Sequence, residues 1–260
     1  MIFETHAHFD DKYFDEDRDV LLGSMEAAGI GRIVNIGADL ASTKTSLALA
    51  DKYPFIYAAV GVHPSSADEL TEEGYEWLKA QTAHEKAVAV GEIGLDYYWV
   101  KEAEGRENQR YWFRRQLNLA REVGLPVVIH SREAAKDTLD IAKEERMQEI
   151  GGVIHCFSYS VEMAREYLNM GFYLGIGGVV TYKNGKNLKE VVAYAPLDQL
   201  VLETDSPYLT PVPFRGKRNS SLNLPYVVSA IAEIKQITPE EVMDVTWQNA
   251  MKLYRMQGER

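Results

Sequence analysis

The stretch W-F-R-R-Q-L-N-L-A-R-E-V-G-L-P-V-V-I-H-S-R, residues 112–132, contains the repeating unit of this fold. Its first half groups apolar residues on one helical face, from Trp112 to Val123. Gly124 then stands where a left-handed helix cap is expected, and the apolar, β-branched run 127–129 has the character of a buried strand. His130 marks the end of that run. The stretch therefore predicts a helix, a tight turn and a strand with a histidine at its carboxyl end.

The same alternation of strand and helix recurs along the chain. Glycine turns like that at Gly124 are expected at Gly29 and Gly171, and Thr238 followed by Pro239 predicts the start of a last helix that runs to about Met256. Short apolar runs predict eight strands, at 2–3, 33–36, 56–60, 87–90, 127–129, 153–154, 172–174 and 200–202.

Eight such units without a Gly-, Ser- or Pro-rich linker favour one fold, a single (β/α)8 TIM barrel of the α/β class that forms one domain over residues 1–260. A doubly wound sheet is the alternative. No G-x-G-x-x-G sequence follows a strand and opens a helix, so the fingerprint of the dinucleotide-binding version of that sheet is absent.

Composition bounds the class of protein. The 260 residues are 46% hydrophobic and 26% charged, as in globular proteins, and the single cysteine excludes a disulfide framework or a zinc site built from several thiolates. The first residues lack the basic and apolar regions of a secretory signal, and no apolar run is long enough to span a bilayer. We therefore expect a cytoplasmic protein without a membrane partner.

The net charge is −11, from 28 Lys and Arg against 39 Asp and Glu. An overall negative field repels nucleic acid, which argues against a protein that coats duplexes non-specifically. It does not argue against an enzyme that handles phosphate through metal ions, because acidic metal ligands contribute negative charge of their own.

Histidines gather where the predicted strands end. In a barrel, functional side chains lie at the carboxyl ends of the strands and in the loops just after them. Only His84 falls elsewhere. The histidines at strand ends are His6, His8, His63, His130 and His155, and the acidic residues in equivalent places are Glu92, Glu203 and Asp205.

These residue types predict a metal centre. Alternate residues of a strand face the same way, so His6 and His8 form a chelating pair. Imidazole and carboxylate without thiolate suit a divalent first-row metal or magnesium, and we expect Mg, Mn or Zn. Six donors exceed what one tetrahedral ion uses and predict two ions per chain that activate a water for hydrolysis, with Glu92 placed to bridge them. The six are His6, His8, Glu92, His130, His155 and Asp205.

Six motifs resemble one known family. They are H-A-H-F-D at 6–10, G-V-H-P at 61–64, G-E-I-G-L-D at 91–96, P-V-V-I-H-S-R at 126–132, H-C-F-S at 155–158 and L-E-T-D-S-P-Y-L at 202–209. In this order they resemble the TatD family of metal-dependent deoxyribonucleases, within the amidohydrolase superfamily. The resemblance implies that His6, His8, Glu92 and Asp205 hold one ion, and that Glu92, His130 and His155 hold the other.

Further residues have supporting roles in this interpretation. His63 is expected to contact the substrate phosphate or leaving group, or alternatively to cap a helix. Arg132 follows His130 by two residues and is expected to bind phosphate, with a surface ion pair as the alternative. Glu203 orients a water, binds an additional ion or only forms hydrogen bonds at the barrel mouth. Asp205 is expected to take the proton of the attacking water, unless it is only a ligand. Cys156 is expected to pack rather than ligate.

Two loops are candidates for contact with a nucleic acid. The aromatic run 97–99 follows the fourth strand, and the basic run 214–219 contains Arg215, Lys217 and Arg218. Aromatic faces stack bases and cations hold backbone phosphate, although aromatic loops more often pack and charged runs are usually solvated.

Together these features favour a phosphodiesterase that acts on DNA, and a narrow mouth favours trimming of single-stranded ends by an exonuclease. The alternatives are a small-molecule amidohydrolase or lactonase with the same metal centre, and a binding protein without activity. The basic loop and Arg132 favour phosphate over a carbonyl substrate, and the complete ligand set argues against a protein that has lost activity.

Overall fold

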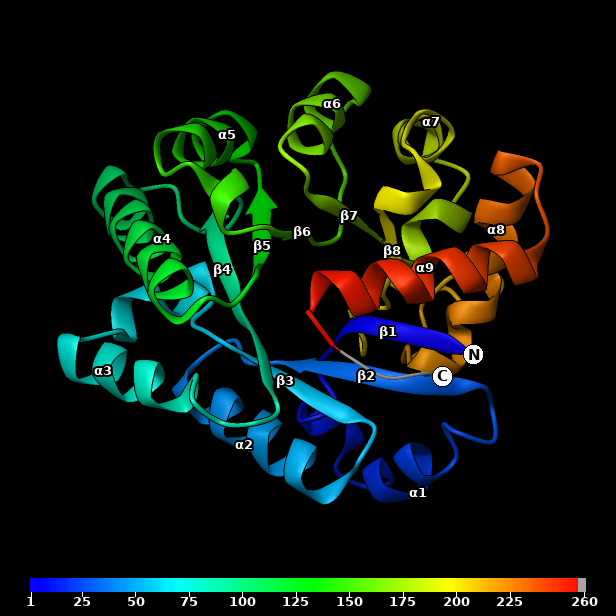
Figure 1. Ribbon diagram of the computed structural model, residues 1–260, viewed down its shortest axis with the longest axis horizontal. Coiled ribbons are helices and arrows are strands. Elements are labelled where there is room, and N and C mark those ends of the chain that lie inside the picture. Colours follow the sequence, from blue (N-terminus) through cyan, green and yellow to red (C-terminus); the bar gives the residue numbers. More distant parts are fainter. Residues whose placement is uncertain (257–260) are drawn as a thin grey trace.

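The computed structural model describes residues 1–256 of the chain. Eight parallel strands form one sheet in the order β1 to β8, so each strand pairs with its neighbour in the sequence, and the helices surround the sheet (Figure 1). The strands are β1 (Ile2–Ala7), β2 (Ile30–Ile36), β3 (Ile56–Val60), β4 (Ala87–Asp96), β5 (Val127–Arg132), β6 (Gly152–Ile154), β7 (Tyr173–Ile176) and β8 (Leu200–Leu202). This is the predicted (β/α)8 barrel.

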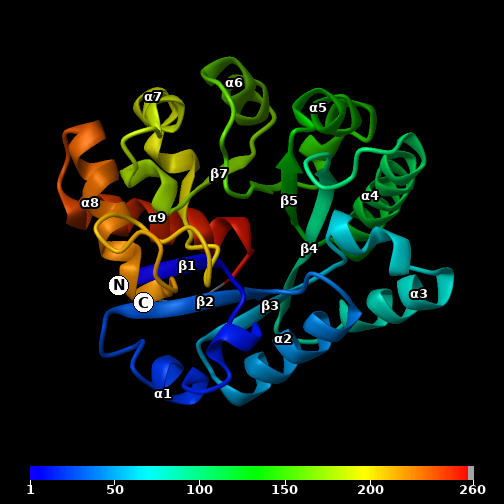
Figure 2. The same ribbon diagram turned by 180° about the vertical axis from the view of Figure 1, so that it is seen from behind.

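Nine helices connect and cover these strands within the described residues. They are α1 (Arg18–Gly23), α2 (Leu40–Lys52), α3 (Glu72–Gln81), α4 (Ala103–Val123), α5 (Ala135–Glu144), α6 (Val161–Asn169), α7 (Lys186–Tyr194), α8 (Leu224–Lys235) and α9 (Pro239–Leu253). Figure 2 shows the ring of helices from the other side, with the long segment between β8 and α8 in gold. No helix among residues 1–256 has both the length and the apolar character needed to cross a bilayer.

Most of the predicted turns are present. Gly124 and Gly171 have φ of 71° and 79° just after α4 and α6, and the Thr238 side chain accepts a hydrogen bond from the Glu241 N–H at the start of α9. Gly29 also has a positive φ of 84°, but α1 ends six residues earlier, so Gly29 belongs to a turn rather than to a helix cap. Helix α9 ends at Leu253, before the predicted Met256.

The barrel closes between β1 and β8 through few backbone contacts. A single parallel bridge joins Ala7 to Ser206, the His8 N–H donates to the Ser206 carbonyl at 2.9 Å, and the Asp205 N–H donates to the His6 carbonyl at 3.0 Å. Helix α9 packs across this seam and buries Trp247 against Phe3, with ring centroids 5.5 Å apart (Figure 1). The seam therefore holds three predicted ligands, His6, His8 and Asp205, at one place.

Buried Glu4 strengthens the seam. Its carboxylate accepts hydrogen bonds from the His6 N–H, from the Thr204 N–H and hydroxyl, and from the Ser221 hydroxyl, at 2.7–3.1 Å. Burial raises the pKa of Glu4 to about 8, although these hydrogen bonds act in the opposite direction. One carboxylate thus connects the strand of His6 with the residue before Asp205.

Candidate metal centre

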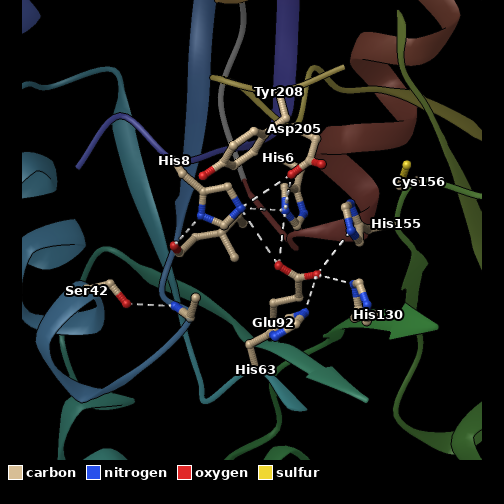
Figure 3. Close-up of polar contacts among 12 residues, drawn as sticks. His6, His8, Ser42, His63, Glu92, His130, His155, Cys156, Asp205 and Tyr208 are labelled. Carbon is tan, nitrogen blue, oxygen red and sulfur yellow. Dashed lines mark hydrogen bonds and ion pairs between the residues drawn. The ribbon is translucent and has the colours of Figure 1, made fainter. Parts of the chain in front are cut away.

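Glu92 lies at the centre of the predicted ligands, with one group of them on each carboxylate oxygen (Figure 3). Its Oε2 is 3.4 Å from His6 Nε2 and 3.8 Å from His8 Nε2, and Asp205 Oδ1 completes this first group at 3.5 Å from His8 Nε2. Its Oε1 is 2.7 Å from His130 Nδ1 and 3.0 Å from His155 Nε2. Glu92 therefore lies between His6 and His8 on one side and His130 and His155 on the other.

The outer nitrogens of His8 and His130 contact acceptors of the protein, and that of His155 faces a carboxylate without forming a hydrogen bond to it. His8 Nδ1 lies 3.1 Å from the Ile36 carbonyl, His130 Nε2 lies 3.2 Å from Asp96 Oδ2, and His155 Nδ1 lies 3.4 Å from Glu203 Oε1. A carbonyl or carboxylate accepts from a protonated nitrogen, so when a cation replaces the proton between such a ring and Glu92, the remaining proton lies on the outer nitrogen and the inner nitrogen offers its lone pair. This is the tautomer that a metal ligand needs, and such outer contacts are typical of histidines that bind metal.

In His63 the nitrogen that faces Glu92 carries the proton and the outer nitrogen carries the lone pair. Its Nδ1 accepts a hydrogen bond from the Ser65 N–H at 3.0 Å, so the proton of the neutral ring is on Nε2, which faces Glu92 Oε1 at 3.7 Å. Burial and the neighbouring His130 lower the pKa of His63 to about 3, which keeps the ring neutral. His63 therefore both caps the short helix at Pro64–Glu69 and presents an N–H donor to the centre, which suits contact with a substrate oxygen better than ligation.

The charges of the centre are strongly coupled. Burial alone would raise the pKa of Glu92, but His155, His63 and His6 hold it well below its usual value. Burial disfavours a charged His8, yet its hydrogen bond to Asp205 and the nearby carboxylates raise its pKa to about 9. The pKa of His155 is likewise raised, by Glu92 and Glu203. When no cation is bound, protons therefore lie between some of these ring nitrogens and the neighbouring carboxylates.

The donors fit divalent cations on their geometry. His6 Nε2 and His8 Nε2 converge to 3.2 Å, so at most one of the two nitrogens carries a proton between them. Three clusters among the described residues have ligand atoms that all lie within 4.8 Å of one another: His6, His155 and Glu203; His6, His8 and Asp205; and His63, Glu92 and His130. Lone pairs directed at a common point, beside carboxylates, are the environment of a hard or borderline divalent ion.

Asp205 and Glu203 differ in their roles. Asp205 follows β8 with a φ of 54°, a left-handed backbone that turns its carboxylate toward His8. Glu203 points to the far side of His155, where its Oε1 accepts the Cys156 N–H at 2.5 Å. A Cβ at Gly175 would lie 2.1 Å from Glu203 Oε2, so only glycine leaves room for this carboxylate. Glu203 therefore holds the backbone of the residue after His155, and the Cys156 sulfur lies away from Glu92 (Figure 3).

Asp96 is a residue of the centre that sequence reasoning missed. It lies at the end of β4, four residues after Glu92, and its Oδ2 holds His130 while its Oδ1 accepts the N–H groups of Tyr98 and Trp99. Residues four apart on a strand share a face, which was the available signal. The predicted strand stopped at 90, and for that reason Asp96 fell outside it.

Three of the cations predicted to contact the substrate lie over aromatic rings. Arg132 is exposed, and its guanidinium carbon lies 3.9 Å from the centroid of the Tyr98 ring. Arg215 lies over Tyr182 at 4.3 Å and Lys217 over Phe214 at 5.6 Å. Among the described residues, none of these three cations forms an ion pair.

Arg218 and Tyr97 already have partners within the protein. Arg218 makes a two-pronged ion pair with Asp17, at 2.7 and 2.6 Å, and joins the segment after β8 to the start of α1. A phosphate on Arg218 would have to compete with Asp17, so the role predicted for Arg218 is not used in the proposal below. Tyr97 is buried and donates its hydroxyl to Asp137 at 2.7 Å, so of the aromatic run only Tyr98 and Trp99 remain available.

The barrel and its cluster of histidines and carboxylates at the strand ends are those of a metal-dependent hydrolase. Comparison with known families agrees, since the model of the family described as TatD related DNase matches residues 3–255. The chain belongs to the TatD family.

Individual relatives match over almost their whole length. The chain is 46% identical over 256 residues to the metal-dependent hydrolase YabD of Bacillus subtilis strain 168, covering 98% of this chain and 100% of YabD. It is 34% identical over 263 residues to the metal-dependent hydrolase YcfH of Escherichia coli K12, covering 100% and 98%. The crystal structure of YJJV, a TatD homologue from Escherichia coli K12, superposes with a TM-score of 0.91 at 30% identity and covers 98% of both chains.

A more distant likeness extends to other hydrolase barrels. A phosphotriesterase homology protein from Escherichia coli, solved with phosphate in its active site, superposes with a TM-score of 0.70 at 11% identity over 97% of this chain and 98% of that one. At this identity the likeness concerns the fold alone.

Proposed function

We propose that this protein is a deoxyribonuclease that hydrolyses phosphodiester bonds at single-stranded ends, with two divalent ions at the Glu92 centre. The observation that carries the proposal is the placement of Arg132, Arg215 and Lys217. In a protein of net charge −11, Arg132 ends β5, Arg215 and Lys217 lie in the segment that follows β8, and none of the three has a carboxylate partner among the described residues. Cations left free beside a metal centre suit a phosphate substrate.

The family supports the same substrate class. The model that matches the chain is described as a DNase family, and the full-length relatives are named metal-dependent hydrolases. The identity of the ions is part of the proposal, and Mg, Mn and Zn are all compatible with imidazole and carboxylate donors.

Each residue of the centre has a role in this proposal. Bound divalent ions would supply Lewis-acid activation of a water and neutralise charge on the phosphate. Asp205, whose pKa is held below its usual value by His8, His155 and His6 against the effect of burial, is ionised and able to accept the proton of the water. The neutral His63 ring donates a hydrogen bond from its Nε2–H to a phosphate or leaving-group oxygen, and Arg215 and Lys217 hold the adjacent backbone.

The alternative is a small-molecule amidohydrolase or lactonase. The same ligands serve a carbonyl substrate, but such a substrate gives no reason for unpaired cations beside the site. The two functions are separated by offering the metal-loaded protein labelled oligonucleotides and a panel of lactones and amides.

The direct test uses single-stranded and double-stranded oligonucleotides labelled at the 5′ or the 3′ end, with EDTA as control. We expect metal-dependent ladders of products from linear single strands and little cutting of closed circular duplex. The double variant R215A/K217A should raise the KM for oligonucleotides and flatten its salt dependence by roughly 0.7 per lost contact in the log–log slope. Efficient cutting of closed circles would contradict the preference for ends, and turnover of lactones alone would contradict the nuclease.

A further inference from the structure

The loop between β4 and α4 is fixed directly to the metal centre. Asp96 uses one carboxylate oxygen for His130, at 3.2 Å, and the other for the N–H groups of Tyr98 and Trp99, at 2.9 and 3.2 Å. The Asp96 carboxylate is itself buried, with 2% of the residue exposed. The backbone of the aromatic pair is therefore held one side chain away from a predicted metal ligand.

The side chains of this loop are nevertheless turned to solvent. Trp99 is 67% exposed and Tyr98 is 40% exposed, whereas Tyr97 beside them is buried and hydrogen-bonded. The rings of Tyr98 and Trp99 meet at 88° with centroids 4.7 Å apart. A tryptophan exposed to this degree contributes little to packing, while its held backbone leaves an aromatic face that is available for stacking.

Arg132 completes the group from the neighbouring strand. It pairs in register with Asp96 across β4 and β5, and it lies 3.9 Å above the Tyr98 ring and 5.9 Å from the Trp99 ring. Among the described residues Arg132 has no ion pair, whereas Arg110, Arg114 and Arg115 of helix α4 each bind at least one carboxylate. Tyr98 thus supports a guanidinium whose N–H donors are free for an anion.

We propose that Trp99 and Arg132 form a nucleotide subsite next to the His130 side of the metal centre. The aromatic base of a strand end stacks on Trp99, and Arg132 donates to the phosphate of that nucleotide. Tyr98 and Asp96 position these two side chains. The inference rests on the proposed nuclease function, but it concerns recognition of a base, which the metal centre itself does not provide.

The test compares ends with and without a base. Trp99→Ala should raise the KM for an oligonucleotide with a natural terminal nucleotide by roughly 5- to 150-fold, the factor that corresponds to about 1–3 kcal/mol per stacked base. The KM for the same oligonucleotide with an abasic end should change little, and kcat should be retained on both. Arg132→Ala should raise the KM for both ends alike, because the phosphate is present in each.

Tyr194→Ala is the matched control. Tyr194 is an exposed ring with Arg165 5.5 Å from its centroid, and it ends α7, away from the strand ends that carry the metal ligands. This variant should behave as wild type on both substrates. Equal losses for natural and abasic ends in Trp99→Ala would overturn the base subsite.

A binding measurement keeps the subsite separate from the nuclease function. Calorimetry with Mg²⁺ present compares thymidine 5′-monophosphate with deoxyribose 5-phosphate. We expect the nucleotide to bind more tightly to the wild type and the difference to disappear in Trp99→Ala. If that pattern is found and no oligonucleotide is cleaved, the subsite stands and the nuclease proposal fails. If the wild type does not distinguish the two ligands, the subsite is wrong whatever the activity.

Discussion

Asp205 is the residue whose charge matters most for the proposed chemistry. Asp205→Asn keeps an oxygen that faces His8 but removes the group that accepts the proton. We expect kcat to fall by roughly 10²–10⁴-fold, the usual contribution of a general base, while most of the bound metal is retained. Measuring kcat and metal content on the same preparation checks this. Near-normal turnover would leave Asp205 a ligand only.

Asp96 is expected to act through His130 rather than on the substrate. Asp96→Asn can keep an acceptor for the N–H groups of Tyr98 and Trp99, but its amide N–H₂ then faces the proton on His130 Nε2. Metal affinity should fall by about 10- to 100-fold, as for other outer partners of ligand histidines. Titration with a competing chelator measures it, and rescue of activity by excess metal would mark a positioning role. Unchanged affinity would show that Asp96 serves the loop alone.

At the scale of single residues, the sequence identified the candidate ligands but not the residues that contact them or pair with the predicted cations. The six candidate ligands could be picked out from the sequence because each stands at or just after an apolar run. The pairing of Arg218 with Asp17 joins positions 201 residues apart, and no local pattern carries it. Likewise, the tautomer that separates His63 from the ligand histidines depends on the Ser65 backbone, which only the folded chain places.

At the scale of elements, the strands were located correctly but drawn too short. β1 was expected at 2–3 and extends to Ala7, and β4 was expected at 87–90 and extends to Asp96. Polar residues continue β1, and polar and glycine residues alternate with apolar ones in the rest of β4, although both strands are buried over their whole length. In β4 the glycines are required by close packing, since a Cβ at Gly94 would lie 1.9 Å from the His130 carbonyl oxygen. An apolar run therefore marks only part of such a strand and not its end.

The seam between β1 and β8 should depend on Glu4. Glu4→Ala leaves four buried donors without their acceptor, and we expect a loss of roughly 3–5 kcal/mol in the free energy of unfolding. Denaturant unfolding of the metal-free protein measures this loss. Glu4→Gln is the matched control, because it keeps one acceptor oxygen and the hydroxyls of Thr204 and Ser221 can rotate, so its loss should be smaller. An Ala variant as stable as the wild type would show that α9 alone holds the seam.

At the scale of the whole molecule, metal binding should be coupled to pH. In the metal-free protein the pKa of His8 is raised to about 9, so this ring carries a proton at neutral pH, and the pKa values of His130 and His155 are shifted in the same direction. A divalent ion needs the lone pairs of these rings and must displace their protons. Affinity should therefore fall as the pH is lowered below about 9, by about tenfold per pH unit for each proton released. Chelator competition at pH 6, 7 and 8 checks this dependence, and equal affinity at the three values would contradict it.

The central claim is that Glu92 joins two ligand sets and that hydrolysis depends on both ions. The most direct measurement is elemental analysis of the reconstituted protein and of Glu92→Ala, together with cleavage of an end-labelled single strand by each sample. We predict about two divalent ions per wild-type chain, loss of cleavage in EDTA, and a Glu92→Ala variant that retains neither ion well and loses activity by orders of magnitude. Full cleavage by the metal-free protein, or a Glu92→Ala variant that keeps two ions and normal activity, would contradict the account.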